Sequence, residues 1–271
     1  MKKILVINND YHVPQSALDF AIQIAKREKA TLYGLFVQSL QNKDAEDYLF
    51  PSDINLTDTD FTKATDKQEN LQFEETNIQL FSDICSSSGV PYKTHPIHAA
   101  FLDTLIDHSA FADLIVCDAD TSPSQYSIKT LVANAHCPVL LVNKDYKQID
   151  NIIFTYDDKS SSIHAIKYFT YLFKFYSNLP VHFVSVVPHN VIGIEYADLI
   201  KEWLPLHYAN AQIVILNGET KEELSGYINN HSNPLVIMGA FGRSSLSRFF
   251  KESLAYLILE KTNAPLFITH N

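Results

Sequence analysis

The sequence has few of the features that mark membrane-spanning, secreted or nucleic-acid-binding proteins. Among its 271 residues no apolar run approaches the ~18 residues that cross a bilayer. The 21 Lys and Arg are outnumbered by 31 Asp and Glu, and the net charge of -10 leaves no basic cluster for nucleic acid or anionic lipid. The apolar run at residues 4–7 is too short for a secretory signal. Three cysteines without metal-ligand spacing indicate reduced thiols (Cys85, Cys117, Cys137). These absences predict a cytoplasmic protein without nucleic-acid or membrane partners.

The chain is instead rich in buried-type residues, and it repeats itself. Its apolar fraction of 46%, with 17 Phe and 14 Tyr, is typical of a folded globular chain. Matching segments occur in the same order in both halves: 3–10 with 151–158, a helical pattern after each of these, 114–117 with 235–238, and 137–142 with 264–269. This order predicts two related domains, 1–146 and 149–271, joined by the short polar link 145–150.

Each half reads as alternating strands and helices. In the second half we expect strands near 151–157, 181–187, 211–216, 235–239 and 265–269, and helices near 161–177, 195–205, 219–230 and 251–261. In the first half, 66–88 reads as a long helix that ends at Gly89, a residue suited to a helix C-terminus. Runs of Val, Ile, Leu and Phe suit strands that are buried on both faces. The alternation predicts an α/β fold with two doubly wound parallel-sheet domains.

The stretch 238–254 carries the strongest chemical signal. It follows an expected buried strand and precedes an expected helix, which is where open α/β sheets bind ligands. Gly239 and Gly242 would let the backbone approach a phosphate, and the chain has only 7 glycines. Arg243 offers a guanidinium, and Ser253 a hydroxyl. An ordinary strand–loop–helix turn remains the alternative.

The same stretch resembles the signature of universal stress proteins, in which two glycines separated by two residues are followed, nine residues later, by Gly and then Ser or Thr. Gly239, Gly242 and Ser253 match this pattern, and Glu252 stands where the third glycine is expected. The resemblance extends to 264–269 and to the first strand and helix of each half. It implies the adenine nucleotide alpha hydrolase-like fold in a tandem with pseudo-twofold symmetry.

The resemblance also implies roles for particular residues. In nucleotide-binding members an aspartate after the first strand meets adenine or ribose, and Asp157 matches it. A valine at the end of the second strand touches the base, and Val186 matches it. Gly239, Gly242 and Ser253 would hold the phosphates of ATP or AMP, beside Arg243.

Both halves depart from this pattern. In the first half Asn9 replaces the aspartate, Asp118 replaces the first glycine, six residues of the loop are missing, and Gln125 lies near the last glycine position. In the second half the Glu252 carboxylate would cost up to about 4 kcal/mol at ~4 Å from a phosphate charge. We therefore expect no nucleotide in the first half and weak or no binding in the second.

Three other patterns in the sequence carry weaker signals. Asp157 and Asp158 form an acidic pair like that of receiver domains, but the expected acceptor aspartate is missing at 216–218. His95 and His98 lie three apart on an expected strand, so they would face opposite sides and serve packing or solvent rather than a metal. Six aromatic residues at 168–176 indicate core and interdomain packing, with a ligand groove as the alternative.

The sequence thus predicts a binding protein of stress response rather than an enzyme. A nucleotide hydrolase or transferase on the same fold is the alternative, although no nucleophile elbow or Walker motif occurs. Universal stress proteins of single-domain type dimerise through their last strands, so the resemblance implies that the last strands of the two halves, Val139–Val142 and Leu266–Thr269, run side by side. The chain would then be a monomer with an internal pseudo-dimer, or a homodimer of such monomers.

Overall fold

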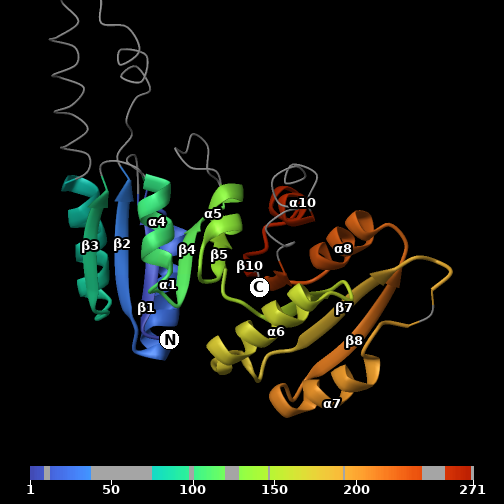
Figure 1. The fold of residues 1–271 in the computed structure, drawn as a ribbon. Coiled ribbons are helices and arrows are strands. Elements are labelled where there is room, and N and C mark those ends of the chain that lie inside the picture. Colours follow the sequence, from blue (N-terminus) through green and yellow to red (C-terminus); the bar gives the residue numbers. More distant parts are fainter. Residues whose placement is uncertain are drawn as a thin grey trace, which may run out of the picture.

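The strands of both halves join in one sheet of ten strands (Figure 1). The computed structural model describes residues 1–8, 13–37, 75–97, 101–119, 128–145, 147–191, 193–239 and 254–269. The strand order is β3-β2-β1-β4-β5-β10-β9-β6-β7-β8. Each half therefore has the strand order of a doubly wound domain. The two orders are mirror images about the junction between β5 and β10.

The first half alternates strands and helices as the sequence predicts. Its elements are β1 (Lys3–Asn8), α1 (Gln15–Glu28), β2 (Thr31–Val37), a helical segment at 75–87, β3 (Tyr92–Ile97), α4 (Phe101–Ser109), β4 (Leu114–Asp118), α5 (Ile128–Asn134) and β5 (Val139–Val142). Positions 66–74 of the expected long helix lie outside the described residues.

The second half follows the same plan. Its elements are β6 (Asn151–Tyr156), α6 (Ser160–Leu172), the 3₁₀ turn η1 (Lys174–Tyr176), β7 (Val181–Val187), α7 (Ala197–His207), β8 (Ala211–Asn217), α8 (Thr220–Asn229), β9 (Pro234–Gly239), α10 (Leu254–Lys261) and β10 (Leu266–Thr269). Within the described ranges, no helix combines the length and apolarity that crossing a bilayer requires.

The prediction that the last strands lie side by side is confirmed. β5 and β10 pair antiparallel, with Phe267 opposite Leu140, while all other pairs in the sheet are parallel. Both strands are fully buried. An antiparallel pair between two copies of the same strand is what a twofold arrangement of the halves requires, so neither last strand leaves an open edge.

One hydrophobic core continues from the first half into the second. On the face covered by α1, α6 and α7, a single buried cluster includes residues from β1 to β10. Phe267 of β10 meets Phe169 and Phe173 edge-on, with ring centroids 5.4 and 5.8 Å apart. The Arg27 guanidinium of α1 lies over the Phe175 ring at 5.1 Å. Phe169, Phe173 and Phe175 therefore serve core and interdomain packing, as predicted, whereas Tyr171 of the same stretch is exposed.

The expected helix 161–177 is shorter than predicted. α6 ends at Leu172, where Phe173 leaves helical geometry (φ -115°, ψ 47°), and a 3₁₀ turn follows. Phe173 is fully buried and stacks on Phe169 at 4.8 Å. The helix thus ends where the Phe173 ring makes its tertiary contacts. The helical spacing of apolar residues in the sequence does not predict such contacts.

Candidate functional site

The predicted site residues that the structure describes lie at the carboxyl ends of three adjacent strands. Asp157 follows β6, Val186 lies near the end of β7, and Gly239 ends β9. In the sheet β6 stands between β9 and β7, and the order reverses between β9 and β6. Ligands of open α/β sheets bind at such a switch point. Gly242, Arg243, Ser253 and Glu252 lie outside the described residues.

Gly239 is required by packing as well as by any ligand. A Cβ atom added there would lie 2.4 Å from the carbonyl carbon and 2.5 Å from the oxygen of Ser161, and 2.6 Å from the nitrogen of Ser162. These are backbone atoms in the first turn of α6, so they cannot move aside cheaply. The glycine therefore lets α6 begin directly against the end of β9. Sequence reasoning assigned Gly239 to phosphate contact alone and missed this cause.

The two neighbouring aspartates, Asp157 and Asp158, differ in role: the first carboxylate is accessible and the second is structural. Asp157 Oδ2 lies 3.0 Å from Lys159 Nζ, and the Asp157 side chain is 42% exposed. Asp158 instead adopts a left-handed backbone (φ 61°), and its carboxylate accepts the Glu195 backbone N–H at 3.0 Å. Asp157 is thus the more exposed of the two carboxylates, and Asp158 holds the loop before α7.

Tyr156 fastens the same loop from the other side. Its hydroxyl donates to the Glu195 carbonyl at 3.1 Å, and its ring lies 5.0 Å from that of Phe183. Burial, together with the nearby Asp158 and Glu195 carboxylates, raises the pKa of Tyr156 to about 12. The phenol therefore stays a donor at neutral pH. The sequence held no signal for this role, because Tyr156 reads simply as the end of a strand.

An apolar groove of about 640 Å³ runs between α6 and α7, beginning at Tyr196 beside the candidate site. Its walls come from both helices and from β7 (Ile163, Ile166, Lys167, Tyr171, Phe183, Tyr196, Leu199, Ile200, Glu202, Trp203, Leu206). At the matching place in the first half, Gly34 lets the Phe81 ring approach to 2.9 Å from its Cβ position. Phe183 fills that place in the second half. The first half thus has a glycine packed under Phe81 where the second half has Phe183 in the wall of the groove.

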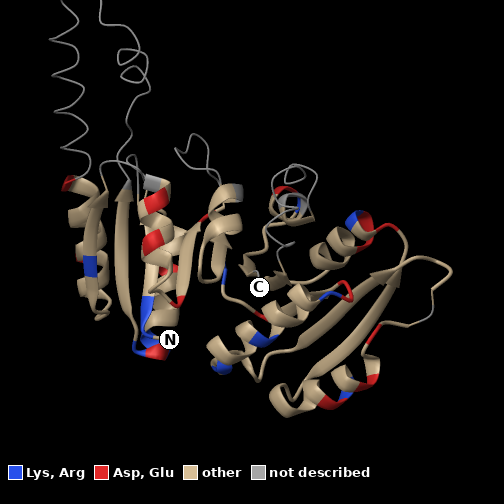
Figure 2. Ribbon diagram, in the orientation of Figure 1, with Lys and Arg blue, Asp and Glu red and all other residues tan. Residues whose placement is uncertain are grey.

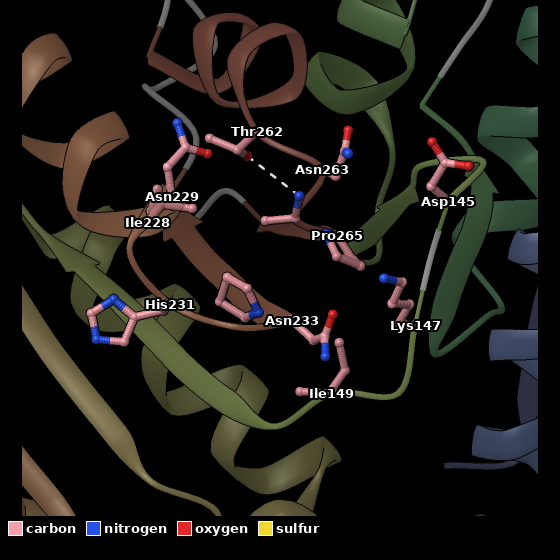
Figure 3. A pocket seen from close by; sticks show the side chains of 12 residues that line it. Asp145, Lys147, Ile149, Ile228, Asn229, His231, Asn233, Thr262, Asn263 and Pro265 are labelled. Carbon is pink, nitrogen blue, oxygen red and sulfur yellow. Dashed lines mark hydrogen bonds between the residues drawn. The ribbon is translucent and has the colours of Figure 1, made fainter.

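A second cavity, of about 480 Å³, lies at the opposite ends of the strands (Figure 3). It is bounded by the interdomain link, the end of α8 and the turn before β10, with Lys147, His231, Asn233 and Thr262 among its lining residues. Thr262 Oγ1 accepts the Ala264 N–H at 3.4 Å. Since this cavity opens at the amino ends of β9 and β10, it is separate from the switch-point site.

At the switch point of the first half, buried polar side chains stand at the ends of β1 and β4. Asp118 ends β4 where Gly239 ends β9, and it is buried. Asn8, at the end of β1, is fully buried and donates its amide to the Val6 carbonyl at 3.1 Å. β1 and α1 are separated by residues 9–14, whereas only 157–159 separate β6 and α6. Asn9 and Gln125 lie outside the described residues.

The histidine pattern serves packing in the described part of the chain. The His95 ring stacks on Tyr33 at 5.7 Å and lies 5.5 Å from that of His108. Burial, then the Lys3 and Lys93 charges, lowers the pKa of His95. No group of three metal-ligating side chains occurs among the described residues. His98 lies outside them. The three cysteines are free and buried, as a set of reduced thiols would be.

Fold and site together define a tandem of doubly wound α/β domains with a candidate site at the switch point of the second half. Over 98% of its length the chain is 24% identical to the universal stress protein Slr1230 of Synechocystis sp., of which 99% is covered. The structure is similar to that of a universal stress protein from Archaeoglobus fulgidus, with a TM-score of 0.70, 14% identity, and 99% and 98% of the two chains covered.

A universal stress protein structure from Pseudomonas aeruginosa matches with a TM-score of 0.59 at 15% identity, covering 100% of this chain and 93% of the other. No family model matches the chain. The resemblance to universal stress proteins of tandem two-domain type is confirmed, and so is the fold class.

Proposed function

We propose that this protein is a cytoplasmic universal stress protein that acts in the stress response by binding, and that its second half binds an adenine nucleotide weakly or not at all. The observation that carries the proposal is the convergence of Asp157, Val186 and Gly239 at one switch point. The Asp157 carboxylate is accessible there, and the half-buried Val186 offers an apolar surface suited to a base.

Three features support weak binding. Asp157 already pairs with Lys159, so a ribose hydroxyl has to compete with an ammonium group. Glu252 brings a carboxylate to the predicted phosphate loop. The first half has Asp118 in place of the glycine at the matching position. ATP or AMP would therefore be held by the second half alone, through Asp157, Val186, Gly239, Gly242, Arg243 and Ser253.

The proposal includes the absence of catalysis and of a nucleic-acid partner. In the described chain, Lys and Arg occur on helices, strands and loops of both halves (Figure 2). With a net charge of -10, the electrostatic term that dominates non-specific DNA binding is unfavourable. Salt-sensitive retardation of duplex DNA by the protein would contradict this part of the proposal.

Calorimetry with ATP tests the site. Weak binding to the wild type should be reduced further in Asp157→Asn, which removes the charge and keeps the shape. Asp198→Asn is the matched control, because Asp198 is an exposed aspartate on α7 with a side chain 95% exposed. A loss in both variants alike would place the nucleotide elsewhere. Release of ADP or AMP from ATP by the purified wild type would instead support a hydrolase on the same fold.

A further inference from the structure

The two edges of the ten-stranded sheet differ in a way that bears on assembly. Among the described residues, β3 closes the sheet on the first half and β8 closes it on the second, and each pairs with one neighbour. An edge strand offers unpaired backbone groups that another chain can join. In natural proteins such edges are commonly blocked by charges or by proline.

The directions of the free backbone groups follow from the strand register. Val181 donates its N–H to the Asn210 carbonyl, and Gly218 donates to Val187. Hydrogen bonding alternates along a parallel strand. Even-numbered residues of β8 therefore face β7, and the odd-numbered residues turn their N–H and C=O groups outward (Ala211, Ile213, Ile215, Asn217).

The outer edge of β3, by contrast, is blocked to a further strand. Leu32 donates its N–H to the Pro91 carbonyl, so odd-numbered residues of β3 face β2 and even-numbered residues face outward. One of these outward residues is Pro96, which has no N–H, and Lys93 adds a charge to the strand. In β8, by contrast, all four outward residues keep their N–H groups and none of the seven residues is charged.

We propose that β8 is a dimerisation edge at which a second copy of this chain adds its own β8 antiparallel, forming a continuous sheet across a twofold axis at Val214. Ile213 then lies opposite Ile215 of the second copy, and Ala211 opposite Asn217. The outward groups of both strands are used in about eight hydrogen bonds. Each copy supplies the same patch, as a twofold interface requires.

The side chains fit this arrangement. Ile215 is 41% exposed, and Ile213 and Val214 are half-buried, so β-branched residues meet across the axis. A second copy carries the same net charge of -10, so most surfaces repel it. Charged residues lie on the flanking helices and loops, whereas β8 carries none (Figure 2). The uncharged strand is therefore a place where two copies meet without opposing like charges.

Sedimentation of the full chain over a wide concentration range tests the proposal. The wild type should shift from the monomer mass of 30.7 kDa to twice that mass as concentration rises. Ile215→Pro removes one outward donor and leaves the β7 ladder intact, so it should remain monomeric throughout. Ile215→Val keeps the donor and should still dimerise. Thr94→Pro makes the matched change at an outward position of β3 and should also still dimerise.

Amide hydrogen exchange keeps the test valid if the proline variant folds poorly. In the wild type the N–H groups of Ile213 and Ile215 should gain protection as concentration rises, whereas that of Val214, which faces β7, should be protected at every concentration. A wild type that stays monomeric at the highest concentration would overturn the proposal. So would a dimer whose Ile213 and Ile215 amides exchange at the monomer rate.

Discussion

At the scale of single residues, Gly239 shows how one missing Cβ positions a whole helix. Gly239→Ala forces the methyl group into the backbone of Ser161 and Ser162, so the first turn of α6 has to shift. We expect a loss of about 1–3 kcal/mol in the free energy of unfolding, the range of overpacked positions. Urea denaturation followed by circular dichroism measures it.

Gly226 provides the matched control for that substitution. It lies inside α8, and a Cβ added there meets nothing within 4 Å. Gly226→Ala should therefore raise the free energy of unfolding by about 0.5–1 kcal/mol, because alanine is the better helix former. If both alanine variants changed stability in the same direction, the packing explanation for Gly239 would be wrong.

Glu252 is the residue on which nucleotide affinity should depend most. Glu252→Gly removes both the charge and the bulk, and it should increase ATP affinity; even ~1 kcal/mol corresponds to a factor of roughly five. Glu252→Gln keeps the bulk, so a gain in this variant would identify charge as the cause, and added salt would then help the wild type. Calorimetry on the three proteins decides. Tight wild-type binding that Glu252→Gly leaves unchanged would show that this carboxylate points away from the ligand.

His182 links stability to pH. Its Nδ1 lies 2.6 Å from the Tyr227 hydroxyl and 3.0 Å from the Gln212 amide nitrogen, contacts that suit a neutral ring accepting at Nδ1. Burial, and then the neighbouring His231, lowers the pKa of His182 below its ordinary 6.5. The unfolded chain then binds the proton more readily, so the stabilisation is complete above the unfolded pKa and is lost as pH falls below it toward the folded value.

Urea midpoints should therefore fall between about pH 7.5 and about pH 5.5, and less steeply in His182→Gln than in the wild type. The exposed His189 supplies the control variant, His189→Gln, which should keep the wild-type slope. If the urea midpoint of His182→Gln depended on pH as steeply as that of the wild type, His182 would not be the cause of the pH dependence.

At the scale of elements, the β5–β10 pair and the rings above it join the two halves. Phe267 is fully buried between Phe169 and Phe173. Phe267→Ala should cost about 3–5 kcal/mol, the range for buried Phe. Calorimetric melting checks this. A loss in the free energy of unfolding of less than about 1 kcal/mol would mean that neighbouring side chains move in to fill the cavity left by the ring.

At the scale of the whole molecule, the shared core predicts cooperative unfolding. The only Trp, Trp203, lies on α7 and reports on the second half, whereas circular dichroism reports on both. Because one buried cluster spans both halves, the two signals should change at the same urea concentration. An earlier fluorescence transition would show that the halves unfold separately.

Much of the architecture could be predicted because short stretches of the sequence indicate it. Buried runs of Val, Ile and Leu mark strands, and the repeated order of 3–10 and 151–158 marks the duplication. A doubly wound order then brings the residues after β6 and β9 to one edge, which is why Asp157 and Gly239 could be placed together.

The tertiary structure alone decided the contacts between residues far apart in the chain. Gly239 is required because a side chain there would meet the backbone of Ser161, and Asp158 accepts a hydrogen bond from Glu195. α6 ends where Phe173 meets Phe267. The groove beside α7 has Phe183 in its wall, where the first half has Gly34 packed under Phe81. Periodicity reports which face of an element is buried, but it does not report which partner buries it. The sequence by itself determined the repeat, the sheet and the strand ends at which the candidate residues lie. Packing between distant segments decided how those residues are held and, among the described residues, which edge strand is unblocked.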